Sequence, residues 1–119
     1  MRESAENYLE AILIISLRGG AVRSVDLAEH FGYSKPSISR AVSLLTEHGY
    51  ITRTDDGAIE LTETGSEVAH RVYGRHEALT AWLVSIGVGP EVAAQDACRI
   101  EHVISEESFA RIRAQVEGR

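Results

Sequence analysis

The stretch from Ser24 to Gly49, SVDLAEHFGYSKPSISRAVSLLTEHG, decides the fold of the N-terminal part of the chain. Its first half, Val25 to Phe31, has an apolar edge at helical spacing and ends at Gly32, which breaks a helix. After a short turn, Pro36 stands at a favourable first-turn position, and apolar residues again recur at helical spacing. Two short helices joined by a glycine-containing turn predict a helix-turn-helix.

The outward residues of the second helix suit a DNA groove. They are two cations and small hydroxyls, with no acidic residue before Glu47. Small side chains let a helix lie deep in a major groove, where Lys and Arg contact phosphates or guanine edges. These outward residues are Lys35, Ser37, Ser39, Arg40 and Ser43.

A β-hairpin is predicted directly after this helix. Tyr50–Thr54 and Ala58–Thr62 are β-prone alternating runs around an Asp-Gly turn. A hairpin after a helix-turn-helix is the layout of a winged helix, with Arg53 available for the sugar-phosphate backbone. Any small α+β domain can contain a hairpin, so the order of the three elements carries the DNA-binding prediction.

Helical patterns flank the winged helix on both sides. Ser4 to Leu17 precedes it, and a long helix from Thr62 or Thr64 to about residues 85–87 follows. Further helices are predicted from Glu91 to about Ile104 and after Ser105. The predicted fold class is therefore mainly α, with an N-terminal winged helix-turn-helix that includes a small β-hairpin, followed by a helical lobe.

Composition favours a globular protein of the reducing cytoplasm. The 119 residues are 44% hydrophobic and 25% charged, and the single cysteine allows no internal disulfide. The polar start has no signal-peptide core, and the apolar run Ala11–Ile15 is too short to span a bilayer. The net charge of −6 argues against nucleic-acid binding, but only weakly, because binding needs only a local stripe of cations.

Three potential metal ligands stand close together near the C-terminal end. Cys98, Glu101 and His102 are spaced i, i+3 and i+4, which places them on one face of a helix. A thiolate, a carboxylate and an imidazole suit a divalent transition metal better than Mg²⁺ or Ca²⁺. The simpler interpretation is a buried thiol beside a solvated Glu and His.

Glu10 and His76 strengthen the metal interpretation. His76 interrupts the apolar stripe of the long helix and is expected to point inward, while Glu10 lies on the first helix. Taken alone, each has a simpler role, as a structural histidine and as a surface carboxylate. Together with the triplet they fit zinc with four ligands, or Fe²⁺ or Mn²⁺ with higher coordination.

With these motifs, the sequence resembles the diphtheria-toxin-repressor and manganese-repressor family of metal-dependent transcriptional regulators. The most specific segments are residues 6–10, ENYLE, residues 65–77, and residues 97–105, ACRIEHVIS. The resemblance implies a winged-helix DNA-binding domain over residues 1–63 and a helical metal-binding and dimerisation domain over residues 64–119. It also implies a homodimer that represses metal-uptake genes from double-stranded operator DNA when metal is bound.

The resemblance also implies the site residues. The expected metal is Fe²⁺ or Mn²⁺, with Zn²⁺, Co²⁺ or Ni²⁺ able to substitute. Glu10 matches the manganese-type members, whereas Cys98 matches the iron-type members. The implied ligands are Asn7, Glu10, His76, Cys98, Glu101 and His102. The residues assigned to DNA contact are Arg23, Ser34, Lys35, Pro36, Ser37, Ser39, Arg40 and Arg53.

Two rival functions stay open from the residues. One is a winged-helix regulator that responds to an organic ligand, with the Cys/Glu/His cluster structural or holding zinc. The other is a metal enzyme with an open coordination position. Because no nucleophile–base pair supports the second, we predict that the protein is not an enzyme. We further expect a cytoplasmic location, no membrane partner and no organic cofactor.

Overall fold

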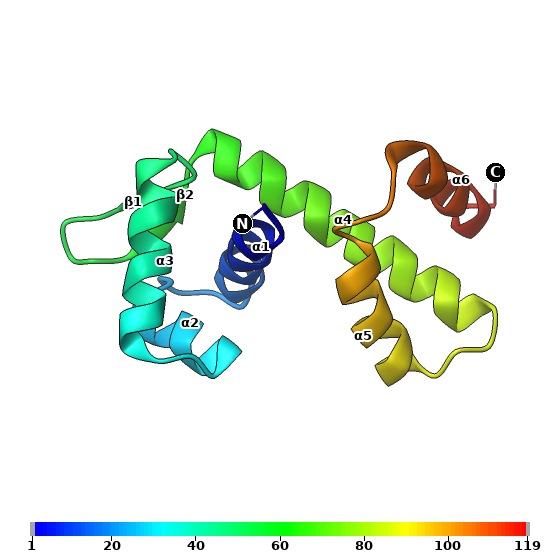
Figure 1. Ribbon diagram of the computed structural model, residues 1–119, viewed down its shortest axis with the longest axis horizontal. Coiled ribbons are helices and arrows are strands. Elements are labelled where there is room, and N and C mark those ends of the chain that lie inside the picture. The colour runs from blue at the N-terminus through cyan, green and yellow to red at the C-terminus, as the bar shows by residue number, and fades with distance from the viewer. Residues whose placement is uncertain (1, 119) are drawn as a thin grey trace. The chain divides into compact units, whose positions relative to one another are not determined.

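The computed structural model describes residues 2–118 and divides the chain into two compact units, residues 1–70 and 71–119 (Figure 1). Within residues 2–118, no helix has both the length and the apolar character that a membrane crossing requires. The elements are α1 (Arg2–Leu17), α2 (Ser24–Phe31), α3 (Lys35–Glu47), β1 (Ile51–Arg53), β2 (Ile59–Leu61), α4 (Glu63–Ser85), α5 (Pro90–Ile100) and α6 (Glu106–Val116).

The first unit packs three helices and a hairpin around one apolar core. α1 contacts α2 and β2, α2 contacts α3, and α3 contacts β1. The three helices and β1 contribute large apolar side chains that expose 1% of their surface or less, and in the helices these residues recur on one face. These side chains are Leu9, Ile12, Leu27, Ile38 and Ile51.

The helix-turn-helix predicted from residues 24–49 is confirmed. α2 ends at Gly32, whose φ of +71° lets its N–H bond back to the Ala28 carbonyl. The Ser34 hydroxyl then accepts the Ser37 N–H and caps α3, with Pro36 in the first helical turn. The two caps fix where one helix stops and the next begins.

The predicted hairpin is also present, and its strands are short. β1 and β2 pair antiparallel with Ile51 opposite Leu61 and Arg53 opposite Ile59. The turn closes with Gly57 donating to the Thr54 carbonyl at 2.9 Å. On the other side of β2, Ile59 donates to the Val22 carbonyl at 2.7 Å, which extends the pairing by one bridge.

A close backbone contact joins the hairpin to α4. The Thr62 hydroxyl donates to the Gly49 carbonyl at 2.7 Å and accepts the Gly65 N–H at 3.1 Å. This geometry brings the backbone of Gly65 against Tyr50, where an added Cβ would lie 1.9 Å from the Tyr50 carbonyl oxygen. Only glycine fits at the start of α4 in this arrangement.

The second unit is built on the C-terminal part of α4, where α5 and α6 lie beside it (Figure 1). Its core joins one buried residue from each helix, Leu79 of α4, Ala97 of α5 and Phe109 of α6. Ile100 and Ile104 are half-buried against this core. The segment between α5 and α6 is thus anchored by apolar side chains at both of its ends.

α5 ends at Ile100, four residues earlier than the sequence pattern predicts. The chain continues in tight turns, with Val103 and Ile104 both donating to the Ile100 carbonyl at 3.0 Å. Ser105 then caps α6 by accepting the Ser108 N–H. The carbonyls of Glu101 and Ile104 accept instead from the side chain of Arg75, which stabilises the turn in place of another helical turn.

We expect Gly65→Ala to lower the free energy of unfolding by about 2 kcal/mol or more, because its Cβ would overlap the Tyr50 carbonyl oxygen. Urea unfolding monitored by circular dichroism measures this change. Gly89→Ser is the matched control, since Gly89 has φ −60° and no atom within 4 Å of its added Cβ. Equal stability of the two variants would contradict the close contact.

Candidate metal centre and nucleic-acid interface

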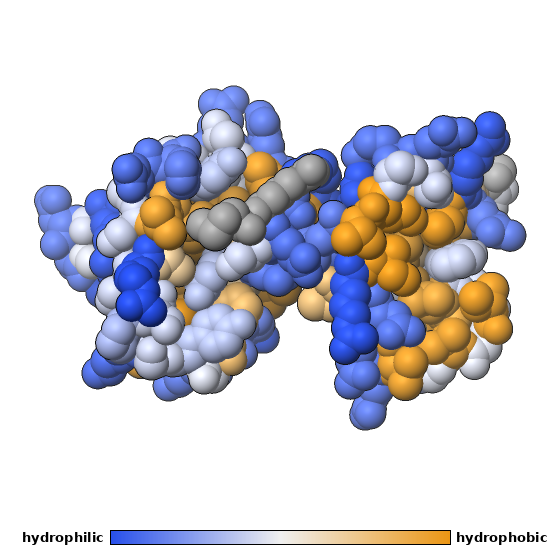
Figure 2. All heavy atoms as spheres, viewed as in Figure 1, coloured by the Kyte–Doolittle hydropathy of each residue, from blue (hydrophilic) through white to orange (hydrophobic). Residues whose placement is uncertain are grey.

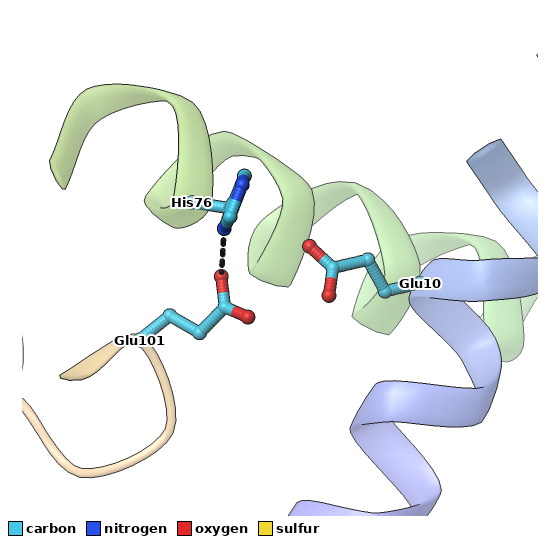
Figure 3. Close-up of side chains that lie close together, drawn as sticks. All are labelled: Glu10, His76 and Glu101. Atoms are coloured by element: carbon cyan, nitrogen blue, oxygen red, sulfur yellow. Dashed lines mark ion pairs between the residues drawn. The ribbon is translucent and has the colours of Figure 1, made fainter. Parts of the chain in front are cut away.

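A buried carboxylate lies between two imidazoles in the second unit. Glu101 exposes 1% of its surface. Its Oε2 lies 3.3 Å from Nδ1 of His76 and its Oε1 lies 3.5 Å from Nε2 of His102. Figure 3 shows the ring of His76 on α4 facing the Glu101 carboxylate, with their ion pair dashed.

This carboxylate is poorly compensated by the surrounding protein. Among residues 2–118, no donor forms a hydrogen bond to either oxygen of Glu101. A buried carboxylate without hydrogen bonds is costly, because burial removes its hydration. The site therefore favours a cation placed beside Glu101.

The spacing of the His76–Glu101 pair suits two ligands of one transition-metal ion. Two donor atoms that each lie about 2.1 Å from one ion are roughly 3.0 to 3.4 Å apart at bond angles of 90 to 109°. The His76–Glu101 distance of 3.3 Å lies within this range, and the distance from His102 to the other Glu101 oxygen, 3.5 Å, lies just beyond it. Imidazole and carboxylate are ligands shared by iron, manganese and zinc sites.

The structure changes the interpretation of Cys98. The prediction that Cys98, Glu101 and His102 share one helical face requires a helix that reaches Ile104. Because α5 ends at Ile100, only Cys98 is in the regular helix, where it is exposed; Glu101 caps the helix with helical backbone angles, and His102 lies in the following turn. The structure brings together His76, Glu101 and His102.

The two remaining predicted ligands belong to the first unit. Glu10, which Figure 3 also labels, and Asn7 both lie on α1. Glu10 is buried and Asn7 is half-buried. Their part in metal binding remains a prediction.

The sequence interpretation missed Arg75, the residue that precedes His76. Its guanidinium is buried and donates to the Glu101 and Ile104 carbonyls at 3.2 and 3.0 Å. A signal was present in the sequence, since Arg75 stands three residues after Val72 and four before Leu79 on the same apolar face. A charge in that stripe indicates a buried polar partner.

The predicted DNA-contacting residues of α3 are mostly exposed. Ser34 and Ser37 are joined by the helix cap, and their hydroxyls lie 3.1 Å apart. The other members are exposed, and their backbone positions are fixed by the cap and by the buried face of α3. They are Lys35, Pro36, Ser39 and Arg40.

Two further predicted DNA contacts, Arg23 and Arg53, also hold the turn of the hairpin. Arg23 donates to the Asp56 carbonyl at 2.7 Å and pairs with the Asp56 carboxylate at 3.0 Å. Arg53 donates to the Ser24 hydroxyl at 3.1 Å and to the Gly57 carbonyl at 3.2 Å. Hydrogen bonds from Thr54 and Arg23 lower the pKa of Asp56 below its usual range.

Known protein families match both halves of the chain. Residues 62–118 match the model of the iron dependent repressor, metal binding and dimerisation domain, and residues 7–58 match the MarR family. The match over residues 62–118 contains His76, Glu101 and His102.

Several transcriptional regulators are similar over most of the chain. The transcriptional regulator MntR of Salmonella typhimurium is 32% identical over 91% of this chain and 69% of its own length. The HTH-type transcriptional regulator MntR of Lysinibacillus sphaericus is 32% identical over 96% of this chain and 82% of its own. An uncharacterized HTH-type regulator of Methanocaldococcus jannaschii is 29% identical over 98% of this chain and 95% of its own.

Solved regulators share the fold. A manganese-dependent transcriptional repressor in complex with manganese has a TM-score of 0.82 and 29% identity over 95% of this chain. The metal-dependent transcriptional regulator MtsR has a TM-score of 0.87 and 21% identity over 98% of this chain. The chain spans about half the length of these two proteins, 52% and 55%.

We expect Glu101→Gln to separate metal binding from stability. In metal-free protein at pH 8, the variant should be as stable as the parent or more stable by about 1 kcal/mol, because a neutral amide is less costly to bury than a carboxylate. The rise in unfolding temperature on adding a divalent transition metal should be lost. Scanning calorimetry with and without metal measures both effects. The exposed Glu107→Gln is the control, and a retained metal-induced rise would rule out Glu101 as a ligand.

Proposed function

Because the chain belongs to the family of metal-dependent transcriptional regulators that includes the MntR proteins, we propose that it represses transcription by binding operator DNA when a divalent metal ion is bound. The observation that carries this proposal is the buried Glu101 carboxylate with two imidazoles beside it, inside the segment that matches a metal-binding domain. The prediction that the chain is not an enzyme is confirmed, since its relatives and fold neighbours are transcriptional regulators.

A metal ion is favoured over an organic effector. The family match to residues 62–118 is a metal binding and dimerisation domain, and the two imidazoles beside the Glu101 carboxylate are metal-ligand types, as is the carboxylate. An organic ligand of ordinary size is instead bound by a mostly apolar pocket with a few polar groups. A buried carboxylate that accepts no hydrogen bond from residues 2–118 suits an ion.

We assign the ion to ligands from both units. His76, Glu101 and His102 form the part within the second unit, and Cys98 is three residues before Glu101. Glu10 and Asn7 on α1 are the proposed ligands from the first unit. When bound, the ion supplies positive charge and coordination bonds that hold these side chains together.

This division of ligands gives the switch its mechanism. Glu10 lies on α1, which packs in the same unit as the recognition helix α3. Coordination that joins Glu10 to the second unit would restrict the orientations available to α3. The ion then favours DNA binding only by the difference in its affinity for the DNA-competent arrangement and for all others.

The proposed ion is Fe²⁺ or Mn²⁺, with Zn²⁺, Co²⁺ or Ni²⁺ able to substitute. Similar proteins are named for manganese, and the matching domain model is named for iron. A carboxylate such as Glu10 suits Mn²⁺, whereas the thiolate of Cys98 favours a softer metal such as iron. The proposed targets are genes of metal uptake, and the proposed location is the cytoplasm.

The exposed face of α3 is the proposed reading surface. Lys35 and Arg40 supply its charge, while Ser39 and Pro36 are small enough for close approach to base edges. The chain has a net charge of −6, so phosphate contacts depend on these local cations. A bound divalent ion also reduces the negative charge of the protein that approaches DNA.

The second unit carries an exposed apolar surface suited to a homodimer. Figure 2 shows hydrophobic side chains gathered over this unit. Its exposed apolar residues include Val84 and Ile86 near the end of α4 and Val92 on α5. Exposed apolar patches mark association sites, and residues 62–118 match a dimerisation domain. A two-fold dimer would present two α3 helices to half-sites about one helical turn, roughly 34 Å, apart.

Metal should control the affinity for DNA. Operators would be selected from a random duplex library with Mn²⁺ present, and binding then measured by fluorescence anisotropy with Mn²⁺, anaerobic Fe²⁺, Zn²⁺ or chelator. We expect at least a 100-fold loss of affinity in chelator, because the metal-free chain samples many orientations of α3. Glu101→Gln should respond to no metal, and Arg40→Gln should weaken binding in every condition. Equal binding with metal and with chelator would refute the switch.

The apolar surface of the second unit should control assembly. We expect Ile86→Arg and Val92→Arg to shift the protein from dimer to monomer, because a buried unpaired charge opposes association. Sedimentation equilibrium measures the dissociation constant, and we expect at least a 100-fold increase. Leu17→Arg, at a similarly exposed position in the first unit, is the control. A dimer that tolerates both Ile86→Arg and Val92→Arg would exclude this interface.

A further inference from the structure

We propose that Arg75 is a positioning residue for the metal centre, which holds the turn that carries Glu101 and His102 in its ion-binding geometry. This inference rests on the proposed metal-binding function and adds a residue that is not itself a ligand. Arg75 lies on α4 directly before His76, and its side chain is only 7% exposed. Its guanidinium therefore points into the second unit.

The contacts of Arg75 converge on one short segment. Nη1 donates to the Glu101 carbonyl at 3.2 Å and to the Ile104 carbonyl at 3.0 Å, and Nη2 pairs with the carboxylate of Glu106. The guanidinium carbon also lies 5.2 Å from the centre of the Phe109 ring. One planar group thus joins α4 to the end of α5, to the turn and to the start of α6.

These bonds act on the ligand residues through the backbone. The carbonyl that Arg75 holds at 3.2 Å belongs to Glu101, the residue whose carboxylate lies between the two imidazoles. A shift of that peptide would move the Glu101 carboxylate and would also move His102, the next residue. Metal sites are sensitive to such shifts, since groups that orient ligands typically contribute 10- to 100-fold in metal affinity.

The charge of Arg75 opposes the positioning effect. A cation near a metal site repels the ion, so removal of the charge alone would strengthen metal binding. Loss of the hydrogen bonds would weaken it. Lys keeps the charge without the planar fork that reaches two carbonyls and a carboxylate, whereas Gln removes both. The two substitutions therefore distinguish positioning from simple electrostatics.

Glu106 provides a milder test of the same contact. Its side chain is 80% exposed, so a substitution there leaves the packing of the second unit intact. Glu106→Gln would remove the charge that pairs with Arg75, which loosens the guanidinium and leaves its charge unbalanced. Both effects should weaken metal binding. Glu107→Gln removes a neighbouring exposed carboxylate and is the control.

Arg113 is a matched control for Arg75. Its guanidinium carbon lies 4.9 Å from the centre of the same Phe109 ring, and it is exposed on α6. Arg113→Gln therefore removes an arginine stacked on Phe109 without removing the bonds that Arg75 makes to the Glu101 and Ile104 carbonyls.

Mn²⁺ affinity of the full chain, measured by electron paramagnetic resonance of free Mn²⁺, tests the proposal. We expect Arg75→Lys and Arg75→Gln each to raise the dissociation constant at least 10-fold, and Glu106→Gln about 3-fold. Arg113→Gln and Glu107→Gln should stay within 2-fold of the parent. At saturating Co²⁺, the visible absorption spectrum of Arg75→Lys should change, a signature that a loss of stability alone would not produce.

Three other results would contradict the proposal or the function on which it rests. Tighter Mn²⁺ binding by Arg75→Gln would overturn positioning in favour of electrostatic repulsion. Parent-like affinity and Co²⁺ spectrum in Arg75→Lys would overturn the need for the planar fork, and with it the proposal. If Arg75→Gln does not fold, Arg75→Lys and Glu106→Gln decide in its place. A parent chain that binds neither Mn²⁺ nor Co²⁺ would instead refute the proposed function itself.

Discussion

The burial of the Glu101 carboxylate is the constraint on which the second unit depends. An ionised carboxylate in the interior loses several kcal/mol of hydration, and no donor in residues 2–118 replaces it with a hydrogen bond. The unit nonetheless places this group beside two imidazoles, at the point where α5 stops and the chain turns toward α6. A cation in the proposed site would offset this cost, and metal binding would then be coupled to folding of the turn.

The sequence predicts the first unit well because its signals are local. Gly32, Ser34 and Pro36 act within one or two turns of the helices that they end or begin, and the Asp-Gly turn fixes the hairpin. The end of α5 is different. Helical periodicity continues to Ile104, but the carbonyls of Glu101 and Ile104 bond to Arg75, about 26 to 29 residues earlier in the chain. Helical periodicity over a few turns cannot predict a contact between residues so far apart in the sequence.

The candidate site shows the same difference between local and distant signals. The sequence predicts an inward His76 because this polar residue interrupts an apolar stripe, and in the structure it lies beside Glu101. The prediction that Cys98, Glu101 and His102 share one helical face assumes a continuous helix, whereas α5 ends at Ile100, before the second and third of these residues. Arg75 lies in the same stripe as His76, but arginine is not a metal ligand, so a pattern of metal ligands does not identify it. Two of its partners are backbone carbonyls, and every residue has one, so the sequence does not show which carbonyls Arg75 contacts.

Arg23 and Arg53, two of the residues proposed to contact DNA, also form contacts within the protein. Arg23 and Arg53 donate to the turn formed around Asp56 and Gly57. Hydrogen bonds from Thr54 and Arg23 lower the pKa of Asp56. In a chain with a net charge of −6, every cation that pairs with an internal carboxylate is one fewer for phosphate. The exposed cations of α3 must then provide much of the local attraction. In the proposed dimer, a weak intrinsic attraction to DNA would make operator binding depend on the metal, because an ion that fixes both α3 helices could then decide whether the operator is bound.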